Sequence, residues 1–253
     1  MAAADWARIP AGEALARAVQ GEGADFAVRT RALVAAGPLL TLQAEFARAQ
    51  AVLEEALALA QQRQDPAATA EAHTYLGLRA VLAGDVAESA QRLREALRRW
   101  EALGDSHGLG LTLFYLGLAA DTTFNLSSTA DTMGDAVAAA HYAAALQWLG
   151  GAGDAQSAGF VHCYLGVVEW RRGDLPDAVE QVQAGVQTSV TLQDRWLLSI
   201  GAQVTVVLVG ARADPAAWAR LLGAADILAQ ATGATLVWQR SPTGQKVGGL
   251  REQ

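Results

Sequence analysis

Apolar residues recur every three or four positions through much of the chain, which is the spacing of one face of an α-helix. In one such stretch the polar positions also form helical pairs, because Glu88 and Arg92, like Glu95 and Arg99, stand four residues apart. The pattern therefore predicts an amphipathic helix there. Its apolar stripe consists of Ala90, Leu93, Leu97 and Trp100.

The pattern repeats along the chain. Three segments carry a Tyr-Leu-Gly motif followed by a Gly-Asp pair, and a weaker copy contains Gly37. The motif glycines are 40, 40 and 49 residues apart, and a set of aspartates is spaced by 40, 49 and 40. Two independent markers thus indicate one period of about 40 residues with a longer third unit. The markers are Gly37, Gly77, Gly117 and Gly166, with Asp65, Asp105, Asp154 and Asp194.

Each unit is predicted to be a pair of helices. In the second unit the first helix is expected at Pro66–Ala83, and Gly84 with Asp85 forms the turn before the second. Glycine permits the turn conformation, and an aspartate caps the helix that follows. Gly77 lies inside the first helix, where glycine costs about 1 kcal/mol relative to alanine. We interpret it as the place where the two helices approach closely.

The expected fold class is all-α, since one hairpin cannot bury its apolar face but stacked hairpins can. We predict a capping helix within residues 1–22, a repeat array over residues 23–232, and a tail over residues 233–253. The four valines between Val204 and Val209 disfavour helix, but the repeat register requires one. The predicted units are residues 23–65, 66–105, 106–154, 155–194 and 195–232.

The motifs Leu76-Gly77, Gly84-Asp85 and Ala96-Leu97 resemble the tetratricopeptide repeat, whose usual unit is about 34 residues. That resemblance implies a right-handed superhelix, an α-solenoid of helical hairpins. Residues 31–37, 51–57 and 219–226 look like the C-terminal repeat regions of large bacterial ATP-dependent regulators, the LuxR-type or maltose-activator-like group. This likeness implies cytoplasmic signalling or transcription regulation. The sequence contains neither the ATPase module nor the helix-turn-helix reader of that group.

Composition and charge exclude several classes of function. The net charge of −7 argues against direct nucleic-acid binding, and Lys246 is the only lysine, with no phosphate-binding loop around it. The single cysteine excludes an internal disulfide and fits a cytoplasmic location. No apolar run reaches the roughly 18 residues of a membrane span. We expect no cofactor, no metal and no membrane association.

In tetratricopeptide proteins the first helix of each hairpin lines the concave face. Mapping by the Leu-Gly marker places aromatic side chains there, among them Phe114, Phe160 and Trp170, which predicts a groove for a peptide or partner domain. The alternative is that these side chains pack against neighbouring helices. The predicted groove residues are Thr74, Leu78, Val81, Leu111, Phe114, Leu118, Asp121, Phe160, Cys163, Val167, Trp170 and Arg171.

No motif supports catalysis. His73 and His162 occupy equivalent places in separate units, and no metal-ligand spacing surrounds them. Cys163 follows His162, but adjacent helical residues point about 100° apart and do not form a nucleophile–base pair. The ten extra residues of the third unit lie within residues 121–133, either as a tolerated surface loop or as a contact loop.

The expected function is a non-catalytic protein-interaction scaffold that binds a protein or peptide. The alternative is a sensor domain that binds a small inducer inside the coil. Self-association is a further expectation, and the apolar stretch from Val204 to Val209 is the surface predicted for it.

Overall fold

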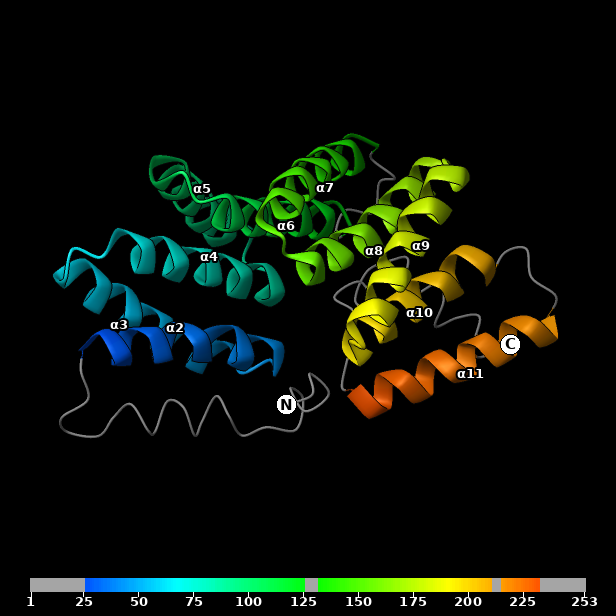
Figure 1. The fold of residues 1–253 in the computed structure, drawn as a ribbon, viewed down its shortest axis with the longest axis horizontal. Helices are drawn as coiled ribbons and strands as arrows, with labels where there is room; N and C mark the ends of the chain where they lie inside the picture. Colours follow the sequence, from blue (N-terminus) through cyan, green and yellow to red (C-terminus); the bar gives the residue numbers. More distant parts are fainter. Residues whose placement is uncertain (1–25, 126–131, 211–214, 233–253) are drawn as a thin grey trace. The chain divides into compact units, whose positions relative to one another are not determined.

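The structure is a computed structural model that describes residues 26–125, 132–210 and 215–232. These residues form ten α-helices and no strand (Figure 1). The prediction of an all-α fold is therefore confirmed. The helices are α2 (Phe26–Leu42), α3 (Phe46–Gln62), α4 (Pro66–Ala83), α5 (Val86–Leu103), α6 (Ser106–Asn125), α7 (Thr132–Ala152), α8 (Ala155–Arg172), α9 (Leu175–Leu192), α10 (Arg195–Gly210) and α11 (Pro215–Thr232).

The chain divides into two compact units, which are described separately. Among the described residues, 26–119 form the N-terminal unit, and 120–125, 132–210 and 215–232 form the C-terminal unit. Within the units, consecutive helices pack in pairs: α2 with α3, α4 with α5, α8 with α9 and α10 with α11 (Figure 1). The first helices of successive pairs also pack together, α2 on α4 and α8 on α10. This is the arrangement of a tetratricopeptide-like helical repeat.

The repeated aspartates begin helices. Asp65 Oδ1 accepts a hydrogen bond from the Ala68 N–H at 2.9 Å, and Asp154 Oδ1 accepts one from the Ser157 N–H at 3.0 Å. Such caps satisfy donors that the first helical turn leaves open. At the other end, Gly84 ends α4 in the left-handed conformation, with φ of 80°. The 40-residue period of the sequence is thus a period of helix boundaries.

The motif glycines allow close helix packing. A Cβ atom on Gly166 of α8 would lie 2.5 Å from Val182 Cγ2 and 3.0 Å from the Ala178 carbonyl oxygen, both on α9. A Cβ atom on Gly77 of α4 would overlap the Leu93 side chain of α5. The helices of each pair therefore approach closer than an alanine would permit, as the sequence suggested.

Helix α10 forms despite its β-branched residues. Val204, Val206, Val207 and Leu208 are buried, and α10 packs against α8, α9 and α11. Burial of the apolar side chains outweighs their modest helix propensity. Most of the stretch is consequently used inside its own unit. Thr205 is half-buried and Val209 is 38% exposed, and self-association stays a prediction.

The insertion in the third of the sequence repeats lengthens both helices of that repeat. Helix α6 has 20 residues and α7 has 21, against 18 in both α4 and α5. Gly134 and Asp135 lie in the first turn of α7, whereas their counterparts Gly84 and Asp85 lie in the turn between α4 and α5. Residues 126–131, the predicted capping helix and the tail from residue 233 lie outside the described residues. None of the described helices is both long and apolar enough to span a membrane.

Candidate functional site

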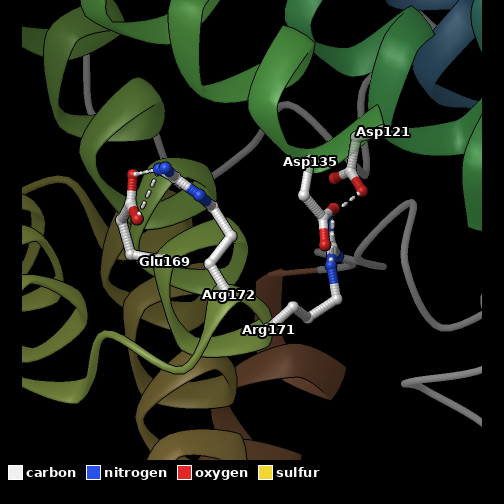
Figure 2. A network of polar contacts seen from close by, with 5 residues as sticks. All are labelled: Asp121, Asp135, Glu169, Arg171 and Arg172. Carbon is white, nitrogen blue, oxygen red and sulfur yellow. Dashed lines mark hydrogen bonds and ion pairs between the residues drawn. The ribbon is translucent and has the colours of Figure 1, made fainter. Parts of the chain in front are cut away.

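Two helices of the C-terminal unit, and the end of α6 that belongs to the same unit, bring charged side chains to one place. Asp121 lies in the last two turns of α6, Asp135 in the first turn of α7, and Arg171 in the last turn of α8 (Figure 2). A carboxylate at a helix start and a guanidinium at a helix end both interact favourably with the helix dipole. We call Asp121, Asp135 and Arg171 the Arg171 cluster.

Arg171 donates to both carboxylates of this cluster. Its Nε and Nη2 donate to Asp135 Oδ1 at 2.9 and 2.5 Å, and Nη2 also donates to Asp121 Oδ1 at 2.6 Å. The side chains of Asp121, Arg171 and Asp135 are only 5%, 13% and 17% exposed. These are charge-assisted bonds at low exposure, where ionic contacts are stronger than on an open surface.

The charges of the cluster do not balance, since two carboxylates face one guanidinium. Burial opposes the charge on Arg171, but Asp121 and Asp135 outweigh this effect and raise the pKa of the guanidinium. Tyr142 and Tyr164 are buried nearby, and burial followed by the charge of Asp121 raises the pKa of each hydroxyl. The tyrosines therefore stay neutral beside a cluster that carries one net negative charge.

The next residue along α8 provides a contrast. Arg172 Nη1 donates to both carboxylate oxygens of Glu169 at 2.8 Å, and the Arg172 side chain is 42% exposed (Figure 2). Consecutive helical side chains point about 100° apart, so one arginine joins three helices while its neighbour makes a local pair. Exposed pairs of the second kind contribute little to stability.

The predicted groove residues of the N-terminal unit lie mostly in its interior. Leu111 is half-buried and the others are buried. Trp100 Nε1 donates to Thr74 Oγ1 at 2.9 Å, and the Thr74 and Thr112 hydroxyls lie 3.3 Å apart. Thr74 thus joins α4 to both α5 and α6. The buried members are Thr74, Leu78, Val81, Phe114 and Leu118.

In the C-terminal unit the predicted residues divide into two groups. Phe160 packs edge-on against Trp196 at a ring-centroid distance of 5.0 Å, and Cys163 and Val167 are buried. Trp170 and Arg171 are half-buried at the end of α8. The structure therefore joins two predicted residues directly, Asp121 and Arg171, through their ion pair. The groove itself stays a prediction.

Sequence reasoning missed Asp135 as a partner of Arg171, and it missed Tyr142 and Tyr164 beside the Arg171 cluster. The only sign of Asp135 was its place in the repeat, where its counterparts cap helices. His162 and Cys163 do not act together, because His162 Nδ1 contacts Gln181 Oε1 at 2.7 Å and burial raises the pKa of the Cys163 thiol to about 12. Among the described residues, no three His, Cys, Asp or Glu side chains are grouped to hold a metal ion.

Comparison with known proteins shows the fold alone. No protein-family model and no curated protein matches this sequence. A Rap protein crystallised with competence and sporulation factor matches 90% of the chain with a TM-score of 0.71 and 12% identity. The chain spans 60% of the length of that Rap protein. BtubC (BKLC) from P. vanneervenii matches with a TM-score of 0.62 and 16% identity, over 92% of each chain. The fold is thus that of tetratricopeptide-like helical repeats.

Proposed function

We propose that this protein is a non-catalytic scaffold that binds a peptide or a partner domain along the first helices of its hairpins. The fold supports this, because stacked helical pairs present extended binding surfaces. A Rap protein of similar fold was crystallised with competence and sporulation factor. The resemblance of residues 31–37, 51–57 and 219–226 to LuxR-type regulators supports a role in cytoplasmic signalling or transcription regulation.

The observation that carries the proposal is the end of α8. There Trp170 remains half-buried beside Arg171, and two carboxylates fix the position of Arg171. Tryptophan and arginine contribute more than other residues to the affinity of protein interfaces. A partly accessible tryptophan on a rigid charged support is suited to contact a partner without rearrangement of the helices.

The chemistry of the surrounding groups favours binding over proton transfer. Burial raises the pKa of Cys163, Tyr142 and Tyr164, so all three stay protonated at neutral pH. A nucleophile or general base needs a pKa near the working pH. For a thiol or a tyrosine hydroxyl the pKa would have to be lowered, whereas here it is raised.

Two tryptophans of the C-terminal unit provide a matched test. Trp170→Ala removes the half-buried ring at the end of α8, and Trp148→Ala removes a 43% exposed ring from α7, outside the predicted groove. The immobilised protein is used to capture partners from the source cell, which are identified by mass spectrometry. We expect a specific partner to be lost with Trp170→Ala and retained with Trp148→Ala. Retention by both variants, each with an unchanged helical spectrum, would contradict the assignment.

One observation favours the alternative of a small-molecule sensor. Helices α9 and α10 enclose a largely apolar groove of about 810 Å³, within the size range of ligand sites. A ligand in this groove should raise the melting temperature by linkage. Val179→Arg would block the groove, whereas Val190→Arg on the same helix lies outside its lining and serves as the control. A melting shift that survives Val179→Arg would place the ligand elsewhere.

A further inference from the structure

A second charged site lies in the N-terminal unit, on α4 and α5. A pocket of about 430 Å³ opens there, and most of its lining comes from one side of α5. The spacing of three and four residues between these positions brings their side chains to the same helical face. We call it the His73 pocket, and its lining consists of His73, Gln91, Arg92, Arg94, Glu95 and Arg98.

The arginines of this pocket are only partly neutralised. Arg92 reaches Glu88 and Glu54 at 3.4 and 3.6 Å, which is longer than a normal hydrogen bond. Arg94 is exposed, and no carboxylate of the described residues pairs with it. Guanidinium donors in this pocket are consequently available to an external acceptor.

The nearby carboxylates are already engaged. Glu95 accepts from Arg98 and also from Arg99, at 2.6 Å in each case, and Glu88 pairs with the buried Arg79. The pocket lining thus holds three guanidinium groups and one carboxylate, an excess of two positive charges in a chain of net charge −7. The side chain of Arg98 is 65% exposed, so this excess faces solvent.

His73 lines the same pocket, and the positive charge of the arginines affects its ionisation. Burial, and then the charges of Arg92 and Arg99, lower the pKa of its imidazole to about 4. The residue is 8% exposed, and its Nδ1 has no hydrogen-bond partner in the described residues. A neutral imidazole with an unused polar atom therefore borders a positively charged pocket.

We propose that the His73 pocket binds the phosphate group of a phosphate monoester. Two excess positive charges match a dianion, whereas a carboxylate would leave one of them uncompensated. Guanidinium groups bind phosphate oxygens in a bidentate fork. Three of them line this pocket, and among the described residues no carboxylate occupies the fork of Arg94, whereas Arg98 already donates its Nε and Nη2 to Glu95. The pocket admits a single headgroup, and the negative charge of the whole chain disfavours an extended polyanion.

The test measures binding at fixed ionic strength and pH 7 by isothermal calorimetry, with His73 ring signals followed by NMR. The probes are inorganic phosphate, and sulfate as a dianion that does not titrate near neutral pH. We expect saturable binding that shifts the His73 signals and weakens about tenfold or more in Arg94→Gln/Arg98→Gln, the loss of at least one charge-assisted contact. Arg31→Gln, an exposed arginine on α2 outside the pocket, should bind as the wild type does.

The absence of saturable binding would overturn the proposal. Equal binding by the wild type and the double variant, with unchanged melting curves, would also overturn it. Both substituted arginines are exposed and Arg94 has no ion pair in the described residues, so the double variant is expected to fold.

Two further probes distinguish the source of the phosphate. A short phosphoserine peptide that binds more tightly than inorganic phosphate and sugar phosphates would identify a phosphorylated partner. Tighter binding of the sugar phosphate than of the phosphopeptide would identify a small metabolite. Each result supports the phosphate site if the Arg94→Gln/Arg98→Gln variant binds the same probe more weakly than the wild type does. The site is independent of the proposed function, which is tested at Trp170 in the other unit.

Discussion

Arginine occupies contrasting environments in the two units. In the Arg171 cluster one half-buried guanidinium is shared by two carboxylates from α6 and α7. In the His73 pocket three arginines on α5 line a solvent-accessible site together with a single glutamate. The first site is closed and slightly negative, and the second is open and positive. Their difference shows that the ratio of charges and the degree of burial decide whether an arginine holds the fold together or remains available for a ligand.

Removing one arginine from each site tests the difference between the two sites most directly. Arg171→Met would leave Asp121 and Asp135 without their shared cation, and we expect it to lower the free energy of unfolding by about 3–5 kcal/mol. Arg94→Met should change that free energy by no more than about 0.5 kcal/mol, because no carboxylate depends on it. Urea denaturation of both variants measures the difference. Similar values for the two variants would contradict the assignment of closed and open sites.

Acid titration examines how burial and the positive charge of the open site act together on His73. The folded-state pKa of His73, about 4, lies below its ordinary value of 6.5. Unfolded chains therefore bind more protons between these values, so the contribution of His73 is complete above pH 6.5 and is lost as the pH falls to about 4. We expect the wild type to lose up to roughly 3 kcal/mol more stability than His73→Gln between pH 7 and pH 4.

Urea denaturation across this pH range measures that difference. Since the carboxylates titrate in both proteins, only the difference between them reports on His73. Parallel stability curves for the wild type and His73→Gln would show that His73 is not held neutral by its surroundings.

Both units contain a close contact between paired helices at a motif glycine, so substitution of that glycine should destabilise each of them. Gly166→Ala places a methyl group against Val182 and the Ala178 carbonyl oxygen, and we expect a loss of about 1–3 kcal/mol. Gly77→Ala should cost less, because its methyl group would meet only side-chain atoms of Leu93 within 3 Å, whereas that of Gly166→Ala also meets a backbone oxygen at 3.0 Å. Gly150→Ala on α7 meets no atom within 4 Å and should be neutral or stabilising by up to about 1 kcal/mol. Thermal melts of the three variants provide the ranking.

Salt produces the smallest expected effect. At 1 M salt the Debye length falls to about 3 Å, so the repulsion between His73 and its arginines is screened while the burial of the ring is unchanged. The pKa of His73 should rise by roughly a few tenths of a pH unit. NMR titration of the ring at low and high salt measures the change. A pKa that does not respond to salt would assign the whole effect to burial.

Helix boundaries were predictable because each depends on local chemistry. The expected helix at Pro66–Ala83 is observed with the same ends, since Asp65 caps its start and Gly84 adopts the left-handed conformation at its end. In α10 the valines argue against helix locally, and the repeat register gave the correct answer because burial dominates there.

The contents of the candidate site were less predictable, because they depend on distant segments. Helical spacing places Thr74 and Cys163 on a given face, but it does not show that neighbouring helices cover that face. The role of Asp135 depends on how the extra residues of the third unit extend α6 and α7, which no repeat marker reveals. Asp121 and Arg171 were recognised as candidates, whereas their third partner was not.

The single cysteine gives this protein a built-in reporter of local opening. Cys163 Sγ faces Gly185 of α9 and Gly201 of α10, and the residue is wholly buried. Because the pKa of the folded thiol is about 12, alkylating or disulfide reagents at neutral pH react only when these helices separate. The labelling rate, divided by that of a free thiol, would give the equilibrium constant for opening at this junction without any introduced probe. A ligand that closes the α9–α10 groove would then be detected as slower labelling.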